Sequence, residues 1–345
     1  MTRGPIRLPS GGPSLFEIFS AGRQGPQTSG HFSRAQIEQI ARTVRRAPEV
    51  MVKVTGGGAK VGAVSAHLGY ISRQGKLELE TDEGERITSR DEHKTLLKSW
   101  HLELSAGQYR RQNERGGPAR TLKLVHNIVL SMPAPTPPEK MLAAARKFTN
   151  EKFALQHRYA MALHTDQKHP HVHLVVKAES ELGRRLHIDK LLLRQWREDF
   201  ARMMREQGIE ANATSRVVRG RNKSQLRDAK YRAQQHGKST ALRQRVMAIA
   251  QELSQTGAVR DPAHGKLIAT RKEVVANWMK AADMLDAQGE IALAGDVRYF
   301  ANHLPPVLTD KEDLARRFIR HIKMQRSASP EGGVKDRAKE RDLAR

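Results

Sequence analysis

The sequence contains no cysteine among its 345 residues. A disulfide framework and a zinc site built on thiolates are therefore excluded, and any metal ion must be held by His, Asp or Glu. Long apolar runs are also missing. No stretch approaches the roughly 20 residues that a membrane-spanning helix needs, and the N-terminal residues lack the apolar core of a secretory signal. We expect a cytoplasmic protein that does not insert into a membrane.

Acidic residues are few relative to basic ones. Lys and Arg number 61 against 37 Asp and Glu, which gives a formal net charge of +24. This imbalance exceeds what solubility requires and indicates a polyanionic partner, because Lys and Arg that neutralise phosphates release the counterions condensed on nucleic acid. The basic residues recur along most of the chain rather than on one amphipathic helix. The pattern therefore favours nucleic acid over a membrane surface.

The composition divides the chain into five parts. Residues 1–32 are rich in Gly, Pro and Ser and are expected to form a disordered arm. Strands interspersed with helices over 33–215 predict one α+β domain with a central antiparallel sheet. We expect a basic helical linker at 216–260, a helical region at 261–326 and a disordered tail at 327–345.

Helix boundaries can be predicted in the region after the linker. Thr270 with Glu273, and Thr309 with Glu312, match the capping box, in which the Thr hydroxyl and the Glu carboxylate each accept an amide N–H of the first turn. Each pair predicts the start of a helix. Gly289 is suited to a helix end, because glycine adopts the left-handed conformation that ends many helices.

The linker is the most basic stretch of the chain. Between Arg216 and Arg245 it carries ten Lys or Arg and a single acid, Asp228. It is either an exposed helix that follows a phosphate backbone or a solvated connection. If it follows a backbone, Arg219, Arg221 and Lys223 are its candidate DNA-binding residues.

The segment RYAMALHTDQKHPHVHLVVKA, at 158–178, predicts a β-hairpin with two different faces. Side chains alternate across a strand, so each strand of the hairpin has an apolar side that joins the core. The other side carries Ala160, Ala162, His164, His169, His171 and His173. We expect the two alanines to leave room for a ligand beside the histidines. Three neutral imidazoles on a rigid hairpin can hold one divalent ion and leave positions open for a phosphate oxygen.

Asp166 lies in the turn of this hairpin and has several possible roles. It can orient a histidine, accept a proton or contact the metal. Two alternatives stay open: a solvated His-rich strand, and a non-haem iron site in which His164 and Asp166 join a distant His187 or His236. The basic charge and the adjacent His171-Val-His173 pair argue against the iron site.

One of the five tyrosines is predicted to be accessible on a helix. The helix expected over 60–73 has an apolar stripe of Val61, Val64, Leu68 and Ile71, at spacings of three, four and three. Tyr70 lies off that stripe. It is therefore expected to face solvent or a site rather than the core.

Three strings together resemble the motifs of a known enzyme family. His164-x-Asp166-x-x-His169-Pro-His171-Val-His173, entering an apolar strand, resembles the third motif of the HUH endonucleases. AHLGYISRQGKLELE at 66–80 resembles the first motif, and HNIVLSMPAPT at 126–136 resembles the second. The closest similarity is to relaxases of the P mobilization class, which include the T-DNA border endonucleases.

The resemblance implies a site and a fold. It implies His164, His171 and His173 as ligands of Mg²⁺ or Mn²⁺, Tyr70 as the nucleophile, and a palm-like antiparallel sheet flanked by helices. Ser131 of the second motif is implied to contact DNA, and we add Arg73 and His169 as DNA-binding candidates and Asp166 as a catalytic one. His126, also in the second motif, is expected to be a structural histidine.

The resemblance also implies a reaction. Tyr70 would attack one phosphate of single-stranded or supercoiled DNA at a transfer origin, form a 5′-phosphotyrosyl intermediate and later religate the strand. Accessory relaxosome proteins and a coupling protein are the expected partners. A rolling-circle replication initiator of the same superfamily and a non-enzymatic DNA-binding accessory factor are the alternatives.

Overall fold

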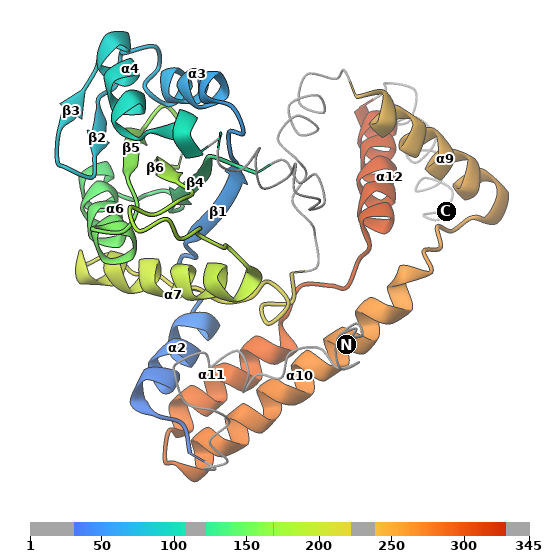
Figure 1. Ribbon diagram of the computed structural model, residues 1–345. Coiled ribbons are helices and arrows are strands. Elements are labelled where there is room, and N and C mark those ends of the chain that lie inside the picture. The colour runs from blue at the N-terminus through green and yellow to red at the C-terminus, as the bar shows by residue number, and fades with distance from the viewer. Residues whose placement is uncertain (1–30, 106, 108–121, 168, 222–238, 329–345) are drawn as a thin grey trace, which may run out of the picture. The chain divides into compact units, whose positions relative to one another are not determined.

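The computed structural model describes residues 31–105, 107, 122–167, 169–221 and 239–328 (Figure 1). The chain divides into two compact units, one of residues 34–214 and one that combines the residues up to 33 with those from 215 onward. Nearly all of the predicted arm and nearly all of the predicted tail lie outside the described residues; the exceptions are residues 31, 32, 327 and 328. In the part of the chain that is described, no helix has both the length and the apolarity to cross a membrane.

A six-stranded sheet forms the centre of the first unit, with the strand order β1-β4-β6-β5-β2-β3. All neighbouring strands run antiparallel. The strands are β1 (Met51–Gly56), β2 (Leu79–Thr81), β3 (Arg86–Ile87), β4 (Val125–Ser131), β5 (Tyr159–His164) and β6 (His171–Lys177). The histidine hairpin thus lies in the middle of the sheet. The predicted α+β class is confirmed, and the sheet is consistent with a palm-like fold.

Helices cover both faces of this sheet (Figure 1). The helices of the unit are α2 (Arg34–Val44), α3 (Val61–Ile71), α4 (Arg90–Ser99), α6 (Pro138–Phe153) and α7 (Lys190–Glu206). On one face, α6 and α7 pack an aromatic group in which the Phe148 and Phe153 rings meet Trp196 at 6.0 and 5.5 Å. On the other face, α3 and α4 enclose a second apolar cluster.

The second cluster corrects one expectation about the hairpin. Ala160 and Ala162 do lie on the face opposite the first core, as alternation predicts. They are fully buried there, in one cluster with Val64 and Leu68 of α3. The expected room for a ligand beside the alanines is therefore wrong, because a helix covers them.

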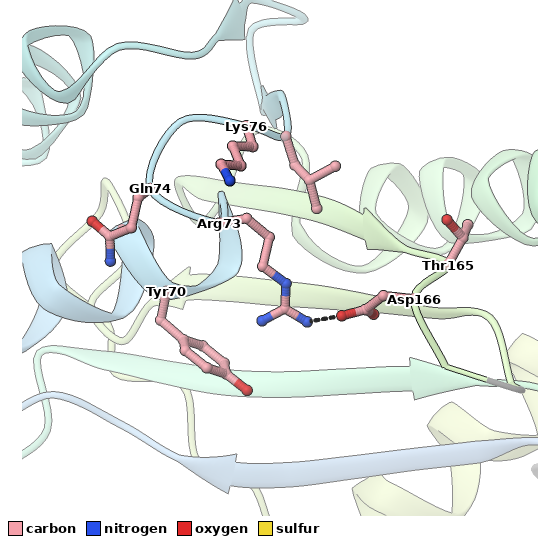
Figure 2. Close-up of a pocket in the computed structure, with 8 residues that line it drawn as sticks. Tyr70, Arg73, Gln74, Lys76, Thr165 and Asp166 are labelled. Carbon is pink, nitrogen blue, oxygen red and sulfur yellow. Dashed lines mark hydrogen bonds and ion pairs between the residues drawn. The ribbon is translucent and has the colours of Figure 1, made fainter.

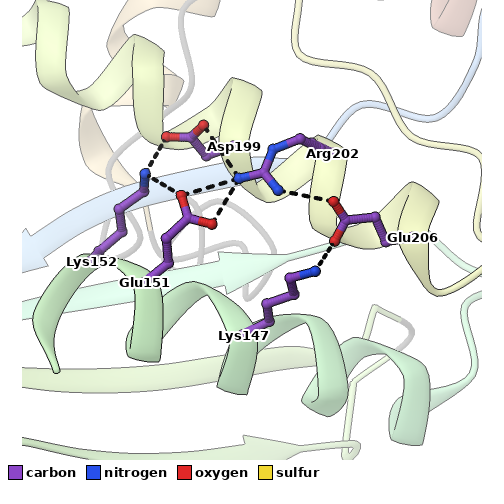
Figure 3. Close-up of polar contacts among 6 residues, drawn as sticks. All are labelled: Lys147, Glu151, Lys152, Asp199, Arg202 and Glu206. Atoms are coloured by element: carbon purple, nitrogen blue, oxygen red, sulfur yellow. Dashed lines mark hydrogen bonds and ion pairs between the residues drawn. The ribbon is translucent and has the colours of Figure 1, made fainter.

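A set of ion pairs joins α6 to α7 on the far side of the sheet from α3 (Figure 3). Arg202 bonds to Glu151 at 2.8 Å and to Glu206 at 2.9 Å, and Lys152 reaches Asp199 at 2.6 Å. These side chains are partly exposed, so each pair contributes less than about 1 kcal/mol. Together these ion pairs hold α6 and α7 side by side on the face of the sheet that they cover.

The second unit is helical in its described part. Its helices are α9 (Thr240–Thr256), α10 (Ala263–Ala287), α11 (Ile291–Asn302) and α12 (Asp310–Ala328). α10 and α11 pack through Trp278, whose indole N–H donates to the Val218 carbonyl at 2.9 Å. This bond ties the described beginning of the basic linker to the helical hairpin.

The predicted helix boundaries of this unit are partly confirmed. The Thr309 and Glu312 side chains form the capping box at the start of α12, and Gly289 follows α10 with a φ of 83°. The start predicted at Thr270 is wrong, because that residue lies inside α10 and its hydroxyl donates to the Lys266 carbonyl. The helix starts earlier, where the Asp261 carboxylate accepts the Ala263 N–H at 2.9 Å.

Candidate active site

The register of three central strands brings the histidines together. Ser131 of β4, His171 of β6 and His164 of β5 are directly paired across the sheet. Directly paired residues point to the same face, and so do residues two positions apart on one strand. His173 therefore joins His171 and His164 on the face that α3 covers. The sheet places one serine and three imidazoles side by side.

His164, His171 and His173 form a group suited to a metal ion. One ring nitrogen from each lies within 4.8 Å of the other two, and the ring centroids are 4.5 to 5.1 Å apart. Among the described residues this group contains no carboxylate. It therefore differs from the two-His-one-carboxylate alternative, for which His187 is exposed in a loop and His236 lies outside the described residues.

The hydrogen bonds of the two buried histidines leave one nitrogen of each available. A carbonyl oxygen only accepts, so Nε2 of His164 donates to the Ile71 carbonyl at 2.6 Å, and Nδ1 of His171 donates to the His169 carbonyl at 3.1 Å. Nδ1 of His164 is buried and has no hydrogen-bond partner in the described structure. An unpartnered buried nitrogen facing two other imidazoles fits a metal ligand, whose second nitrogen is commonly held by a carbonyl.

The electrostatics of the group favour neutral imidazoles. Burial, followed by the neighbouring histidines, lowers the pKa of His173 to about 3, and burial also lowers the pKa of His164. Only the neutral ring offers a lone pair to a metal ion. Near neutral pH, these two side chains are thus in the ligand form without having to lose a proton.

Tyr70 lies on α3 next to this group. The stripe residues Val64, Leu68 and Ile71 are fully buried, whereas 46% of Tyr70 is exposed, as its place off the stripe predicts. The Tyr70 ring meets the His173 ring edge to face, with centroids 6.1 Å apart. An accessible phenol thus lies beside three imidazoles that can hold a metal.

A turn after α3 brings Arg73 back toward Tyr70 (Figure 2). Arg73, Gln74 and Gly75 have φ values of 52°, 60° and 89°, a left-handed conformation that costs energy for the two residues that are not glycine. The guanidinium carbon of Arg73 lies 5.3 Å from the centre of the Tyr70 ring. A cavity of about 520 Å³ opens here, lined by Gly69, Tyr70, Arg73, Gln74, Lys76, Leu77, Thr165 and Asp166.

Asp166 contacts Arg73 and is not part of the histidine group. Its carboxylate forms an ion pair with the Arg73 guanidinium at 2.5 Å. Burial opposes ionisation of Asp166, but the hydrogen bond and charge of Arg73 outweigh it and lower its pKa. Anchoring a cation beside Tyr70 is a role that the sequence did not suggest for this carboxylate.

The remaining predicted site residues are not members of the histidine group. Ser131 is 8% exposed and is paired directly with His171 across β4 and β6. His169 lies in the exposed turn, where its Nδ1 accepts the Ala134 N–H at 3.0 Å. Arg219 and Arg221 belong to the second unit, and Lys223 lies outside the described residues.

His126 lies on the opposite face of the sheet. It pairs with Val176, which packs in the core under α6 and α7, and its Nε2 donates to the Leu186 carbonyl at 3.2 Å. Burial lowers the pKa of His126 to about 4. The expectation that it is a structural histidine agrees with this position.

One residue of the site was missed by the sequence analysis. His67 of α3 stacks on Tyr70 with ring centroids 6.0 Å apart, and its ring lies 6.4 Å from that of His173. The available signal was its spacing, because residues three apart on a helix are neighbours and His67 precedes Tyr70 by three. This spacing indicates a role for His67 only after Tyr70 has been shown to lie beside the histidine group.

Comparisons with known proteins agree with this geometry. Residues 70–209 match the family model of the MobA/VirD2-like nuclease domain of relaxases. The chain is 31% identical over 193 residues to the T-DNA border endonuclease VirD2 of Rhizobium radiobacter, covering 51% of this chain and 43% of that protein. For VirD2 of Rhizobium rhizogenes the identity is 30%, covering 51% and 42%. Residues 70–209 are thus similar to a relaxase nuclease domain of the VirD2-like type, and the chain spans less than half the length of these relatives.

Proposed function

We propose that this protein is a site- and strand-specific DNA relaxase that uses Tyr70 as its nucleophile. The observation that carries the proposal is the contact of an accessible tyrosine with a group of three imidazoles, inside a segment that matches a relaxase nuclease domain. The phenolic oxygen of Tyr70 attacks the phosphorus of one phosphodiester. As the new bond to phosphorus forms, the phenol gives up its proton; the bond to the 3′ oxygen breaks, and that oxygen keeps the electron pair and takes up a proton, so no proton is gained or lost overall.

The reaction conserves the number of phosphodiester bonds. The strand is held as a 5′-phosphotyrosyl adduct, and attack by the 3′-hydroxyl on the same phosphorus reverses the step. His164, His171 and His173 would hold Mg²⁺ or Mn²⁺, which when bound neutralises charge on the phosphoryl oxygens. The Ile71 and His169 carbonyls keep two of these rings in the tautomer that a metal requires.

The substrate we propose is single-stranded or supercoiled DNA at a transfer origin, nicked during conjugative transfer or mobilization. Ser131 lies in the row of the histidines and would contact the strand near the scissile phosphate. Arg73 and His169 would contact phosphates at the rim of the site. In the second unit, Arg219, Arg221 and Lys223 would extend these contacts along the backbone. Accessory relaxosome proteins and a coupling protein are the proposed partners, in the cytoplasm.

The test is covalent trapping with an oligonucleotide that contains the nick site. Wild-type protein with Mg²⁺ or Mn²⁺ should attach to the 5′ end of the downstream strand, and peptide mapping should place the adduct on Tyr70. Tyr70→Phe removes only the phenolic oxygen of a half-exposed residue, so folding should persist and the adduct should be lost. Tyr299→Phe is the matched control, since Tyr299 is 66% exposed in the second unit.

Three outcomes would contradict the proposal. An adduct that persists in Tyr70→Phe would place the nucleophile elsewhere. Cleavage that leaves a free 5′-phosphate without any adduct would indicate a metal-dependent hydrolase. Tight origin binding with no cleavage of supercoiled DNA would indicate an accessory factor.

A further inference from the structure

His67 and Arg73 flank Tyr70 in the sequence. The three residues are spaced by three along the chain, and both neighbours contact the Tyr70 ring, at 6.0 Å for the His67 ring and 5.3 Å for the Arg73 guanidinium carbon. The histidine side faces the metal group, since the His67 ring also contacts His173. His67 thus lies at the boundary between the nucleophile and the group that holds the metal.

The surroundings of His67 leave its ring nitrogens available. The residue is half-buried, and none of the described residues forms a hydrogen bond with it. Its contacts are with the faces and edges of two rings. It stands outside the group of three histidines whose nitrogens lie within 4.8 Å of one another, so it is not a fourth ligand in this arrangement. An imidazole ring carries at least one N–H donor in either protonation state.

A phosphate attacked by Tyr70 has to lie between the phenolic oxygen and the metal group. Two of its oxygens carry charge that grows as the fifth bond to phosphorus forms, and donors aimed at that charge stabilise the transition state. Arg73 is held beside Tyr70 by Asp166. His67 contacts both Tyr70 and His173 of the histidine group.

We propose that His67 is a catalytic residue that donates an imidazole N–H to a non-bridging oxygen of the scissile phosphate during attack by Tyr70. The inference rests on the proposed relaxase function. It assigns a task to a side chain that the sequence motifs did not single out. A purely structural alternative is that the ring only supports Tyr70 by stacking.

Three substitutions separate these two roles. His67→Phe keeps an aromatic ring against Tyr70 and removes the N–H. His67→Asn and His67→Gln remove the ring but keep an amide N–H, near the positions of Nδ1 and Nε2 respectively. His187→Phe is the matched control, because His187 is exposed and follows Leu186, which packs against the core on the other face of the sheet.

The measurement is single-turnover formation of the 5′ adduct on the nick-site oligonucleotide, with saturating Mn²⁺ and protein in excess. Loss of one preorganised donor to the reacting phosphate costs about 100-fold to 1000-fold in rate. We expect a loss of about 100-fold in His67→Phe, and a rate within about tenfold of wild type in His67→Asn or His67→Gln. The control should react at the wild-type rate.

Two further readouts distinguish catalysis from structure. Substrate and adduct are both phosphodiesters, so His67→Phe should slow cleavage and religation equally and leave the final fraction of adduct unchanged. Calorimetric Mn²⁺ affinity should also stay within about threefold of wild type. A structural support of Tyr70 or of the metal group would instead change the adduct fraction or the metal affinity.

The results that would overturn the inference are specific. A rate in His67→Phe within threefold of wild type, or equal losses in all three variants, would show that the N–H has no role. A Mn²⁺ affinity reduced more than tenfold would make His67 part of the metal site. These outcomes leave the relaxase proposal intact, whereas a wild-type protein that forms no adduct overturns both.

Discussion

The Arg73–Asp166 ion pair gives the prediction whose size follows most directly from the structure. The pair joins the turn after α3 to the turn of the histidine hairpin, with the side chains 28% and 54% exposed. A pair this exposed contributes at most about 1 kcal/mol to the free energy of unfolding. Asp166→Asn should therefore change the unfolding midpoint only slightly.

Its effect on cleavage should be larger, because the pair fixes the guanidinium beside Tyr70. Ordering an Arg side chain costs up to about 2 kcal/mol of rotamer entropy. Because the ion pair with Asp166 already restricts the Arg73 rotamers, most of this cost does not arise during DNA binding and cleavage. Without the carboxylate charge, this entropy cost is added to the activation free energy of cleavage, and each 1.36 kcal/mol slows the reaction by a factor of ten. We expect a loss of about 10-fold to 30-fold in single-turnover adduct formation for Asp166→Asn. Arg73→Ala removes the charge itself and should lose about 100-fold or more.

The double variant decides whether Asp166 acts through Arg73. If it does, Arg73→Ala combined with Asp166→Asn should be no slower than Arg73→Ala alone, since the carboxylate then has nothing to hold. Glu206→Gln is a matched control. It breaks a comparably exposed pair with Lys147 on the α6–α7 side of the sheet and should leave cleavage unchanged. A double variant whose rate loss equals the product of the single losses would refute the reasoning and return Asp166 to proton transfer or metal contact.

Two predictions concern the histidines on the two faces of the sheet. His171→Ala and His173→Ala should each lose high-affinity Mn²⁺ binding in a calorimetric titration. His169→Ala should keep it, because His169 contributes to the histidine group only through its backbone carbonyl, which accepts the hydrogen bond from His171. His126 has a folded pKa of about 4 against 6.5 in the unfolded chain, so the unfolded state binds more protons and this histidine destabilises the protein as pH falls from about 6.5 to 4. His126→Gln should reduce the loss of unfolding free energy across that window by at most about 3 kcal/mol, measured by urea unfolding at several pH values; an identical pH dependence in the variant would contradict this.

Local patterns were enough to predict the histidine hairpin and the helix that carries Tyr70. Alternation placed Val172, Leu174 and Val176 on one side of β6 and His171 and His173 on the other, because a strand fixes this division through its pleat. The stripe on α3 likewise separated Tyr70 from the core. The strand order could not be read in this way, since β2 and β5 pair across almost eighty residues.

The contacts that complete the site are those that depend on the position of α3 over the sheet. His67 becomes a neighbour of His173 only because α3 crosses the β5–β6 hairpin. Asp166 was expected to act near the histidines, and it reaches Arg73 because a left-handed turn reverses the chain after Ser72. The crossing of a helix over a sheet and the left-handed backbone conformation of Arg73 leave no periodic pattern in the sequence. An apolar helix face and an alternating strand do leave one.

The C-terminal end of α3 links Tyr70 to the histidine group through the backbone. Tyr70 supplies its side chain to the site, while Ile71 buries its side chain and offers its carbonyl to Nε2 of His164. The hydrogen bond that sets the His164 tautomer therefore also connects the end of α3 to strand β5. A slip of α3 by one residue would remove this bond and carry Tyr70 away from His173 at the same time. Because the main chain of Ile71 forms this link, a substitution of the buried Ile71 side chain should lower stability through packing while leaving the hydrogen bond to His164 in place.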